Sequence, residues 1–127
     1  MMRFRNVLFF VLVLCNGVVF AQIKFIKQSI DEAFQKAKKE NKFILVDVYA
    51  DWCGPCKMMD ATTFKNKEVI RFVNDNLVAV KLNAEKLGGT EFINQHGVRG
   101  FPSFVILDQQ GKKVALKSGK MLSLIHI

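Results

Sequence analysis

The sequence predicts an α/β fold in which a central mixed β-sheet is flanked by helices. Apolar runs typical of strands alternate with amphipathic segments of helical period, and the last two strands are separated only by a short turn. The order of elements is therefore β-α-β-α-β-α-β-β, which is typical of a sheet sandwiched by helices. Between the chain ends lie about a hundred residues without a repeat or linker, enough for one domain with a single core.

The first half of the chain predicts a strand, a helix and a second strand. A short strand is expected at 23–26. Ser29, with Glu32 three residues later, forms a capping-box pattern that opens a helix reaching about Glu40. The apolar face of this helix consists of Ile30, Ala33, Phe34 and Ala37. The run at 43–50 is apolar enough to form a strand buried on both faces of a sheet.

The second half continues the alternation and closes with a hairpin. The expected elements are helices at 53–60, 67–74 and 90–96 and strands at 77–82, 104–107 and 113–117. Gly97 is a natural C-cap for the helix that precedes it. The polar segment 108–111 ends in glycine and is typical of a turn between paired strands.

A Cys-x-x-Cys motif at the end of the predicted strand 43–50 carries the chemistry. Unpaired N–H groups and the positive end of the helix dipole favour a thiolate at Cys53, which lies where the next helix begins. Cys56 lies one turn further along, close enough to form a disulfide, and we expect it to be less exposed than Cys53. Pro55 suits an early helical position. The pattern indicates thiol–disulfide exchange, with Cys53 attacking and Cys56 resolving.

Other uses of two cysteines at this spacing fit the sequence less well. A c-type haem attachment needs a histidine after the second cysteine, where this chain has Lys57. A structural zinc site needs four ligands, and the remaining candidates, Cys15, His96 and His126, are distant in sequence. We therefore expect no metal. A purely structural disulfide remains the alternative.

The N-terminal residues 1–21 have the pattern of a secretory signal peptide. Two arginines precede the apolar segment 7–14, and small residues precede a cleavage site before Gln22. The apolar stretch is shorter than the roughly 20 residues that a membrane span needs, so an uncleaved anchor is only the alternative. Cleavage would remove Cys15 and leave the mature chain with the Cys-x-x-Cys pair alone.

The C-terminal residues 122–127 are what a common library-preparation adapter encodes in this reading frame. We expect this tail to be non-native, so that the domain itself covers 22–121; the alternative is a natural hydrophobic terminus. The formal net charge is +8, but the lysines are scattered rather than interleaved with aromatic residues. A nucleic-acid partner is therefore not expected.

Three segments together resemble thioredoxin in order and spacing. They are Trp52–Lys57 after the strand, then 80–83, and finally 97–103. The segment 49–64 is more similar to the C-terminal periplasmic domain of bacterial transmembrane thiol:disulfide interchange reductases and to small exported proteins related to it. The resemblance covers about 23–121 and implies a thioredoxin fold that lacks the family's final helix through truncation.

The resemblance also implies roles for residues outside the motif. Pro102, preceded by Phe101, matches the family's cis-proline, whose loop faces the cysteines and binds substrate. Asp47 matches an aspartate buried beneath the second cysteine that assists its proton transfers, and burial would raise its pKa. Lys81 matches a neighbour of that aspartate, and Trp52 matches a residue that shields the disulfide. The alternatives are a trans Pro102, a solvent-facing Asp47 and an outward-pointing Lys81.

The expected function is that of an exported, monomeric thiol–disulfide oxidoreductase that reduces disulfide-bearing proteins. Gly54 and Pro55 complete the substrate-binding set, and this dipeptide is the reducing, thioredoxin type. The cysteines themselves are the redox centre, so no cofactor is expected. A membrane-borne donor would supply electrons, because a periplasm has no reducing buffer of its own. The alternatives are an oxidase or isomerase of the same fold, and a redox-inactive binding or chaperone module.

Overall fold

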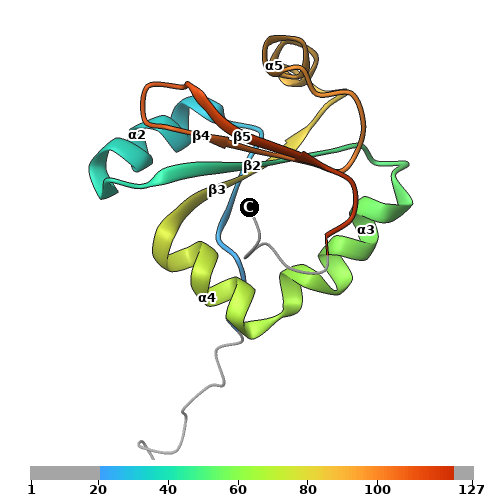
Figure 1. The fold of residues 1–127 in the computed structure, drawn as a ribbon, viewed down its shortest axis with the longest axis horizontal. Helices are drawn as coiled ribbons and strands as arrows, with labels where there is room; N and C mark the ends of the chain where they lie inside the picture. The colour runs from blue at the N-terminus through green and yellow to red at the C-terminus, as the bar shows by residue number, and fades with distance from the viewer. Residues whose placement is uncertain (1–20, 122–127) are drawn as a thin grey trace, which may run out of the picture.

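The computed structural model describes residues 21–121, and Figure 1 shows their fold. The elements in chain order are β1 (Phe25–Lys27), α2 (Ile30–Glu40), β2 (Phe43–Tyr49), α3 (Gly54–Ala61), the 3-10 helix η1 (Thr63–Lys65), α4 (Lys67–Asn76), β3 (Leu77–Asn83), α5 (Gly89–His96), β4 (Ser103–Leu107) and β5 (Lys113–Ser118). The predicted N-terminal signal peptide, apart from residue 21, and the predicted non-native tail lie outside the described residues.

The five strands form one mixed sheet in the order β1-β3-β2-β4-β5. β1, β3 and β2 run parallel, whereas β4 is antiparallel to β2 and β5 is antiparallel to β4. β2 therefore lies at the centre of the sheet, which explains its nearly continuous apolar sequence. The predicted α/β architecture with a central mixed sheet is confirmed.

Helices cover both faces of the sheet. In Figure 1, α2 and α5 lie on one side, and α3 and α4 lie on the other. The alternation of side chains along β2 divides the core into two layers, because Ile44, Val46 and Val48 belong to the first cluster and Leu45 to the second. Asp47 follows Leu45 by two residues, so its side chain belongs to the face that carries α3.

Local signals fix where the helices begin and end. The Ser29 hydroxyl accepts a hydrogen bond from the backbone N–H of Glu32 at 3.2 Å, as the capping-box pattern predicted. Asn66 caps α4 in the same way. Gly97 ends α5 in the left-handed conformation, with φ of 70°.

The structure differs from the predicted elements mainly at the first strand and after α3. β1 comprises Phe25–Lys27 rather than 23–26, because Phe25 pairs with Ala79 of β3 while Ile23 is buried in the core layer beneath the sheet. The 3-10 turn η1 was not predicted. There the Thr63 hydroxyl donates to the carbonyl of Met121 at 2.8 Å, a contact between segments far apart in the sequence.

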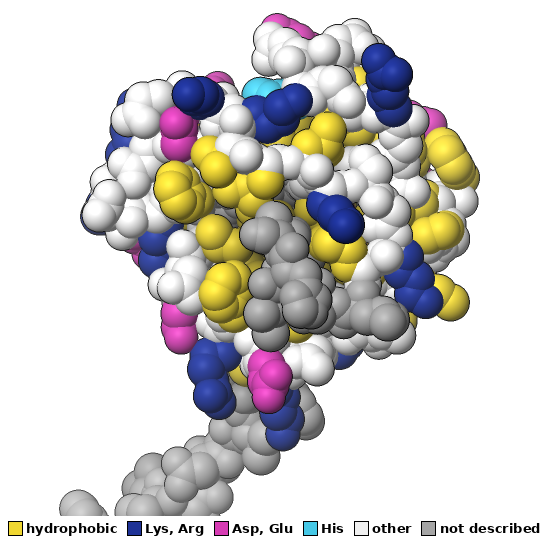
Figure 2. All heavy atoms as spheres, viewed as in Figure 1, with side chains coloured by type: hydrophobic (Ala, Val, Ile, Leu, Met, Phe, Trp, Pro, Cys, Tyr) yellow, Lys and Arg dark blue, Asp and Glu magenta, His cyan; other side chains and the backbone are white. Residues whose placement is uncertain are grey.

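The surface of the described residues carries dispersed charge. Lysine and arginine side chains are spread over the face shown in Figure 2 and do not form one continuous stripe. Among residues 21–121, no helix is both long and apolar enough to cross a membrane.

Candidate active site

The cysteines are placed by the end of the central strand. Beyond Tyr49 the chain leaves the sheet, and the backbone N–H of Ala84 donates to the Tyr49 carbonyl at 2.8 Å. A tight turn follows, in which Cys53 N–H donates to the Ala50 carbonyl at 3.1 Å. This turn delivers Cys53 to the N-cap position of α3.

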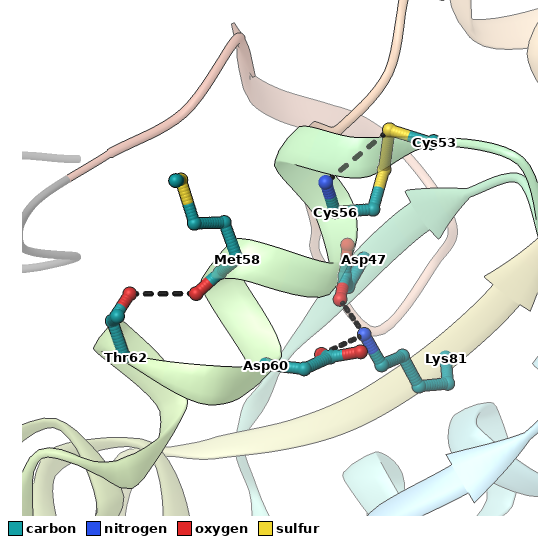
Figure 3. A network of polar contacts seen from close by, with 7 residues as sticks. All are labelled: Asp47, Cys53, Cys56, Met58, Asp60, Thr62 and Lys81. Carbon is teal, nitrogen blue, oxygen red and sulfur yellow. Dashed lines mark hydrogen bonds and ion pairs between the residues drawn. A yellow bond between two sulfur atoms is a disulfide. The ribbon is translucent and has the colours of Figure 1, made fainter.

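Cys53 and Cys56 are joined by a disulfide, and their Cα atoms are 5.3 Å apart. The backbone N–H of Cys56 also donates to the Cys53 sulfur at 3.2 Å (Figure 3). In the reduced protein the same N–H and the helix dipole would stabilise a thiolate at Cys53. Pro55 lies in the first turn of α3, and the space around Gly54 is open, since a Cβ there would meet no atom within 4 Å.

The expected difference in exposure between the two cysteines is wrong. Each has 3% of its surface exposed. The reason is that Ala50 is buried with them, and the half-buried rings of Tyr49 and Phe101 pack against the cluster. Phe101 comes from a distant segment, which is why the position of Cys53 at a helix start did not reveal its burial.

The loop that precedes β4 faces the cysteines. The Phe101–Pro102 peptide bond is cis, Phe101 packs on the cysteine cluster, and Pro102 is buried. Trp52 is 67% exposed, and its ring meets that of Phe101 edge-on with centroids 6.0 Å apart. The indole N–H of Trp52 donates to Glu85 Oε1 at 2.6 Å. These groups form an apolar rim of Trp52 and Phe101 around the disulfide.

Asp47 is buried in the sheet beneath α3, with only 1% of its surface exposed. Its Oδ2 accepts a hydrogen bond from Lys81 Nζ at 2.6 Å. Its Oδ1 is also buried and has no hydrogen-bond partner among the described residues. Figure 3 shows Oδ2 pointing to Lys81 and the other oxygen pointing away from it, toward the side on which Cys56 lies. Oδ1 therefore lies on the Cys56 side of the carboxyl without a partner among the described residues.

Lys81 connects two carboxylates. Its Nζ contacts Asp47 and also Asp60 Oδ1 of α3, at 2.5 Å. The Lys81 side chain is 15% exposed, and that of Asp60 is 49% exposed. The chain of contacts runs from the buried Asp47 through Lys81 to a carboxylate in contact with water.

The electrostatics of this triad follow from its burial. Burial raises the pKa of Asp47 to about 6, although the charge and hydrogen bond of Lys81 lower it, and the charge of Asp60 adds to the rise. Burial lowers the pKa of Lys81, but the two aspartates outweigh that effect and leave it above its ordinary value. Asp47 therefore titrates near neutral pH while Lys81 stays charged.

A cleft of about 380 Å³ opens beside this triad. Its walls include Tyr49, Asp60 and Lys81, with Lys86 also lining it. A larger hollow of about 590 Å³ lies between α2 and α5 and includes neither cysteine. The smaller cleft reaches Asp60 and Lys81, but neither cysteine nor Asp47 lines it.

A family model described as a thioredoxin-like domain matches residues 30–123. The chain belongs to the thioredoxin-like family. Thioredoxin-1 from Drosophila melanogaster is 35% identical over 80 residues, which cover 63% of this chain and 69% of that protein. The thiol:disulfide interchange protein DsbD of Pseudomonas fluorescens is 29% identical over 82 residues. That match covers 64% of this chain but only 14% of the DsbD protein.

Solved structures show the same thioredoxin-like architecture. A putative disulphide-isomerase from Bacteroides thetaiotaomicron superimposes with a TM-score of 0.72 and 32% identity, covering 80% of this chain and 84% of that one. The reduced C-terminal domain of DsbD from Neisseria meningitidis gives a TM-score of 0.62 at 25% identity, covering 77% and 90%. The predicted resemblance to thioredoxin and to DsbD is confirmed.

The structure of this thioredoxin-like chain adds three residues that the sequence analysis did not assign to the site. Asp60 lies four residues after Cys56, a helical spacing that places both on one face and could have revealed it. Glu85 and Asn83 reach the site through loop contacts that carry no local sequence signal. Among residues 21–121, no cluster of three or more His, Cys, Asp or Glu side chains could hold a metal ion.

Proposed function

We propose that this thioredoxin-like protein is an exported thiol–disulfide oxidoreductase that reduces disulfides in other proteins. The observation that carries the proposal is the Cys53–Cys56 disulfide at the N-terminus of α3, above the buried carboxyl of Asp47. An unpaired buried carboxyl oxygen destabilises the fold. A disulfide with a purely structural role would gain nothing from such a group beneath it.

The reaction begins when the Cys53 thiolate attacks one sulfur of a substrate disulfide. The substrate disulfide breaks, one substrate thiolate leaves, and Cys53 becomes part of a mixed disulfide. Cys56 then loses its proton and attacks the Cys53 sulfur. This step releases the second substrate thiolate and forms the Cys53–Cys56 disulfide, so two electrons have passed from the dithiol to the substrate.

Asp47 serves the second step in this proposal. Its free Oδ1 accepts the proton of Cys56, and a carboxyl with a pKa of about 6 is poised for such a transfer near neutral pH. Lys81 stabilises the ionised form, and Asp60 connects Lys81 with solvent.

The proposed substrate contacts are the groups that surround the disulfide. Trp52 and Phe101 offer apolar rings, Gly54 leaves open space for a substrate chain, and the loop at Pro102 faces the cysteines. A protein segment fits this rim better than a compact small molecule, because the contact groups surround the sulfurs instead of enclosing a cavity.

Reduction is the proposed direction because Gly54 and Pro55 separate the cysteines, as in thioredoxin, and no histidine lies between them to stabilise the Cys53 thiolate. Isomerisation is the second candidate, and the name of the similar Bacteroides thetaiotaomicron structure favours it. A redox-inactive binding module is disfavoured because both cysteines are present and bonded.

Export, a membrane-borne electron donor, a monomeric state and the absence of any cofactor complete the proposal. The signal-peptide pattern at 1–21 and the similarity to DsbD support export. Cell fractionation followed by intact-mass analysis tests it, since the exported form should begin at Gln22.

The activity is tested by reduction of insulin with dithiothreitol as electron source. The parent protein should accelerate precipitation of the insulin B chain, whereas Cys53→Ser should give only the uncatalysed rate. A parent that fails to reduce insulin but speeds the refolding of scrambled ribonuclease would replace reduction by isomerisation.

A further inference from the structure

Two loops meet beside the disulfide, and a single buried side chain joins them. The redox loop comprises residues 50–53, between β2 and α3, and the brace loop comprises residues 84–88, between β3 and α5. Asn83 is the last residue of β3 and is only 1% exposed. It lies where the brace loop begins.

The side-chain amide of Asn83 bonds to both loops at once. Its Nδ2 donates to Asp51 Oδ1 at 3.1 Å, and its Oδ1 accepts from the backbone N–H of Glu85 at 2.9 Å. The side chain at position 83 must both donate and accept a hydrogen bond. An aspartate there has the same shape but no donor, and its carboxylate would face the carboxylate of Asp51. Only an amide of this length satisfies both loops.

The backbone of Asn83 is held just as firmly. The Gln28 side chain accepts from Asn83 N–H at 2.9 Å and donates to the Asn83 carbonyl at 3.0 Å. Gln28 itself adopts a left-handed backbone, with φ of 62°, which is rare for a residue with a side chain. A Cβ at Gly89 would overlap the Asn83 carbonyl oxygen, so the chain packs closely around this point.

A second link lies directly outside the first. Glu85, whose N–H bonds to Asn83, holds the indole N–H of Trp52 with its carboxylate. Trp52 adjoins Asp51 in the redox loop and is largely exposed, so the edge contact with Phe101 and the bond to Glu85 are its main restraints. The orientation of the indole therefore depends on the position of the brace loop.

We propose that Asn83 is a positioning residue for the redox loop: by binding Asp51 and Glu85 together, it fixes Trp52 beside the disulfide for contact with a protein substrate. This role rests on the proposed function, because its readout is the reduction of a protein disulfide. Asn83 touches neither the sulfurs nor the substrate. It acts through Asp51 and Glu85.

The first test replaces Asn83 with Asp and compares two substrates. The KM for insulin should rise roughly five- to tenfold, as expected when one partly buried hydrogen bond is lost, while kcat changes little. The rate with hydroxyethyl disulfide, which is too small to need Trp52, should stay unchanged. Trp52 is the only tryptophan, so a loosened indole should also lower the fluorescence anisotropy.

A rescue distinguishes this role from general damage. In the double variant Asp51→Asn, Asn83→Asp, the amide and the carboxylate exchange places, and the bond between the loops forms again. The KM for insulin should return to within about twofold of the parent, since coupled residues show large non-additivity. A double variant as impaired as Asn83→Asp alone would overturn the proposal.

The hydrogen bond between Glu85 and Trp52 gives a test that does not disturb a buried residue. Glu85 is exposed, so Glu85→Ala should fold, and it should raise the KM for insulin and loosen Trp52 as Asn83→Asp does. Glu85→Gln keeps an acceptor oxygen and should remain close to the parent. A parent inactive on insulin would refute the proposed function, whereas an active parent with Glu85→Ala and Asn83→Asp unchanged in KM would refute only the role of Asn83.

Discussion

Asp47 and Lys81 are register partners on the adjacent parallel strands β2 and β3, and their side chains meet at 2.6 Å on the face that carries α3. Burial opposes the charge of Asp47, and Lys81 offsets only part of that effect, so the carboxyl titrates at about pH 6. This balance suits Asp47 to the proposed proton transfer from Cys56, and it also makes ionisation of Asp47 unfavourable for stability.

The first prediction is that Asp47→Asn stabilises the oxidised protein at pH 8 but not at pH 4. The pKa of Asp47 is about 6 in the folded chain, against 3.8 ordinarily, so the folded state holds this proton more tightly than the unfolded state. The parent protein therefore keeps its full stability at low pH and loses part of it as pH rises through 6. At about 1.4 kcal/mol per unit, the parent should lose about 3 kcal/mol relative to the variant. Urea unfolding across this pH range measures the gap.

Asp75→Asn, which changes an exposed aspartate of α4, is the matched control and should show no such gap. A parent that remained as stable as Asp47→Asn at pH 8 would mean that Asp47 ionises without cost in the folded protein.

A second prediction concerns the two neighbours that shift the pKa of Asp47 in opposite directions. Lys81→Met should raise the pKa of Asp47 above 6, because the stabilising charge is lost, and Asp60→Asn should lower it. Carboxyl carbon NMR of the oxidised protein follows the titration directly. Lys86→Met, which removes an exposed lysine of the same cleft, should leave it unchanged. If Lys81→Met and Asp60→Asn shifted the pKa of Asp47 in the same direction, the opposite effects assigned to Lys81 and Asp60 would be wrong.

Asp47→Asn should also slow the second half of the reaction more than the first. Asparagine cannot take a proton from Cys56, so release of reduced substrate from the mixed disulfide should slow and become more dependent on pH. Attack by Cys53 should be largely preserved, since the N-terminus of α3 is unchanged. Rapid-quench kinetics separate the two steps, and unchanged release by the variant would reduce Asp47 to a structural residue.

The order of attack predicts which cysteine variant traps substrate. Cys56→Ser should accumulate mixed disulfides with protein substrates, because Cys53 attacks and nothing resolves the product. Cys53→Ser should trap none. Mass spectrometry of non-reduced complexes identifies the bonded cysteine, and the Cys53→Ser, Cys56→Ser double variant is the blank. Trapping by Cys53→Ser instead would reverse the assigned roles.

The fold was predictable where its signals are local. Apolar runs predicted strands β2 to β5 to within one or two residues, and Ser29 and Gly97 correctly marked helix ends. β1 was misplaced, because a strand of three residues is defined by its pairing with β3 more than by its own sequence.

The site was predictable only in part. The burial of Asp47, which the family resemblance implied, is confirmed, but the inward direction of Lys81 depends on the register between β2 and β3, which no local pattern contains. The burial of Cys53 depends on Phe101, more than forty residues further along the chain. The contacts of Asn83 require the conformations of two loops, and these follow only from the assembled fold.

The reduction potential of the Cys53–Cys56 pair, measured by equilibration with glutathione, tests the central claim most directly. A reductase with Gly54 and Pro55 between its cysteines should have a potential close to that of thioredoxin, about −270 mV. In that case the dithiol can donate electrons to most protein disulfides. A potential near −120 mV, the value of a strong oxidant, would contradict the account and make this protein a source of disulfides instead of a reductant.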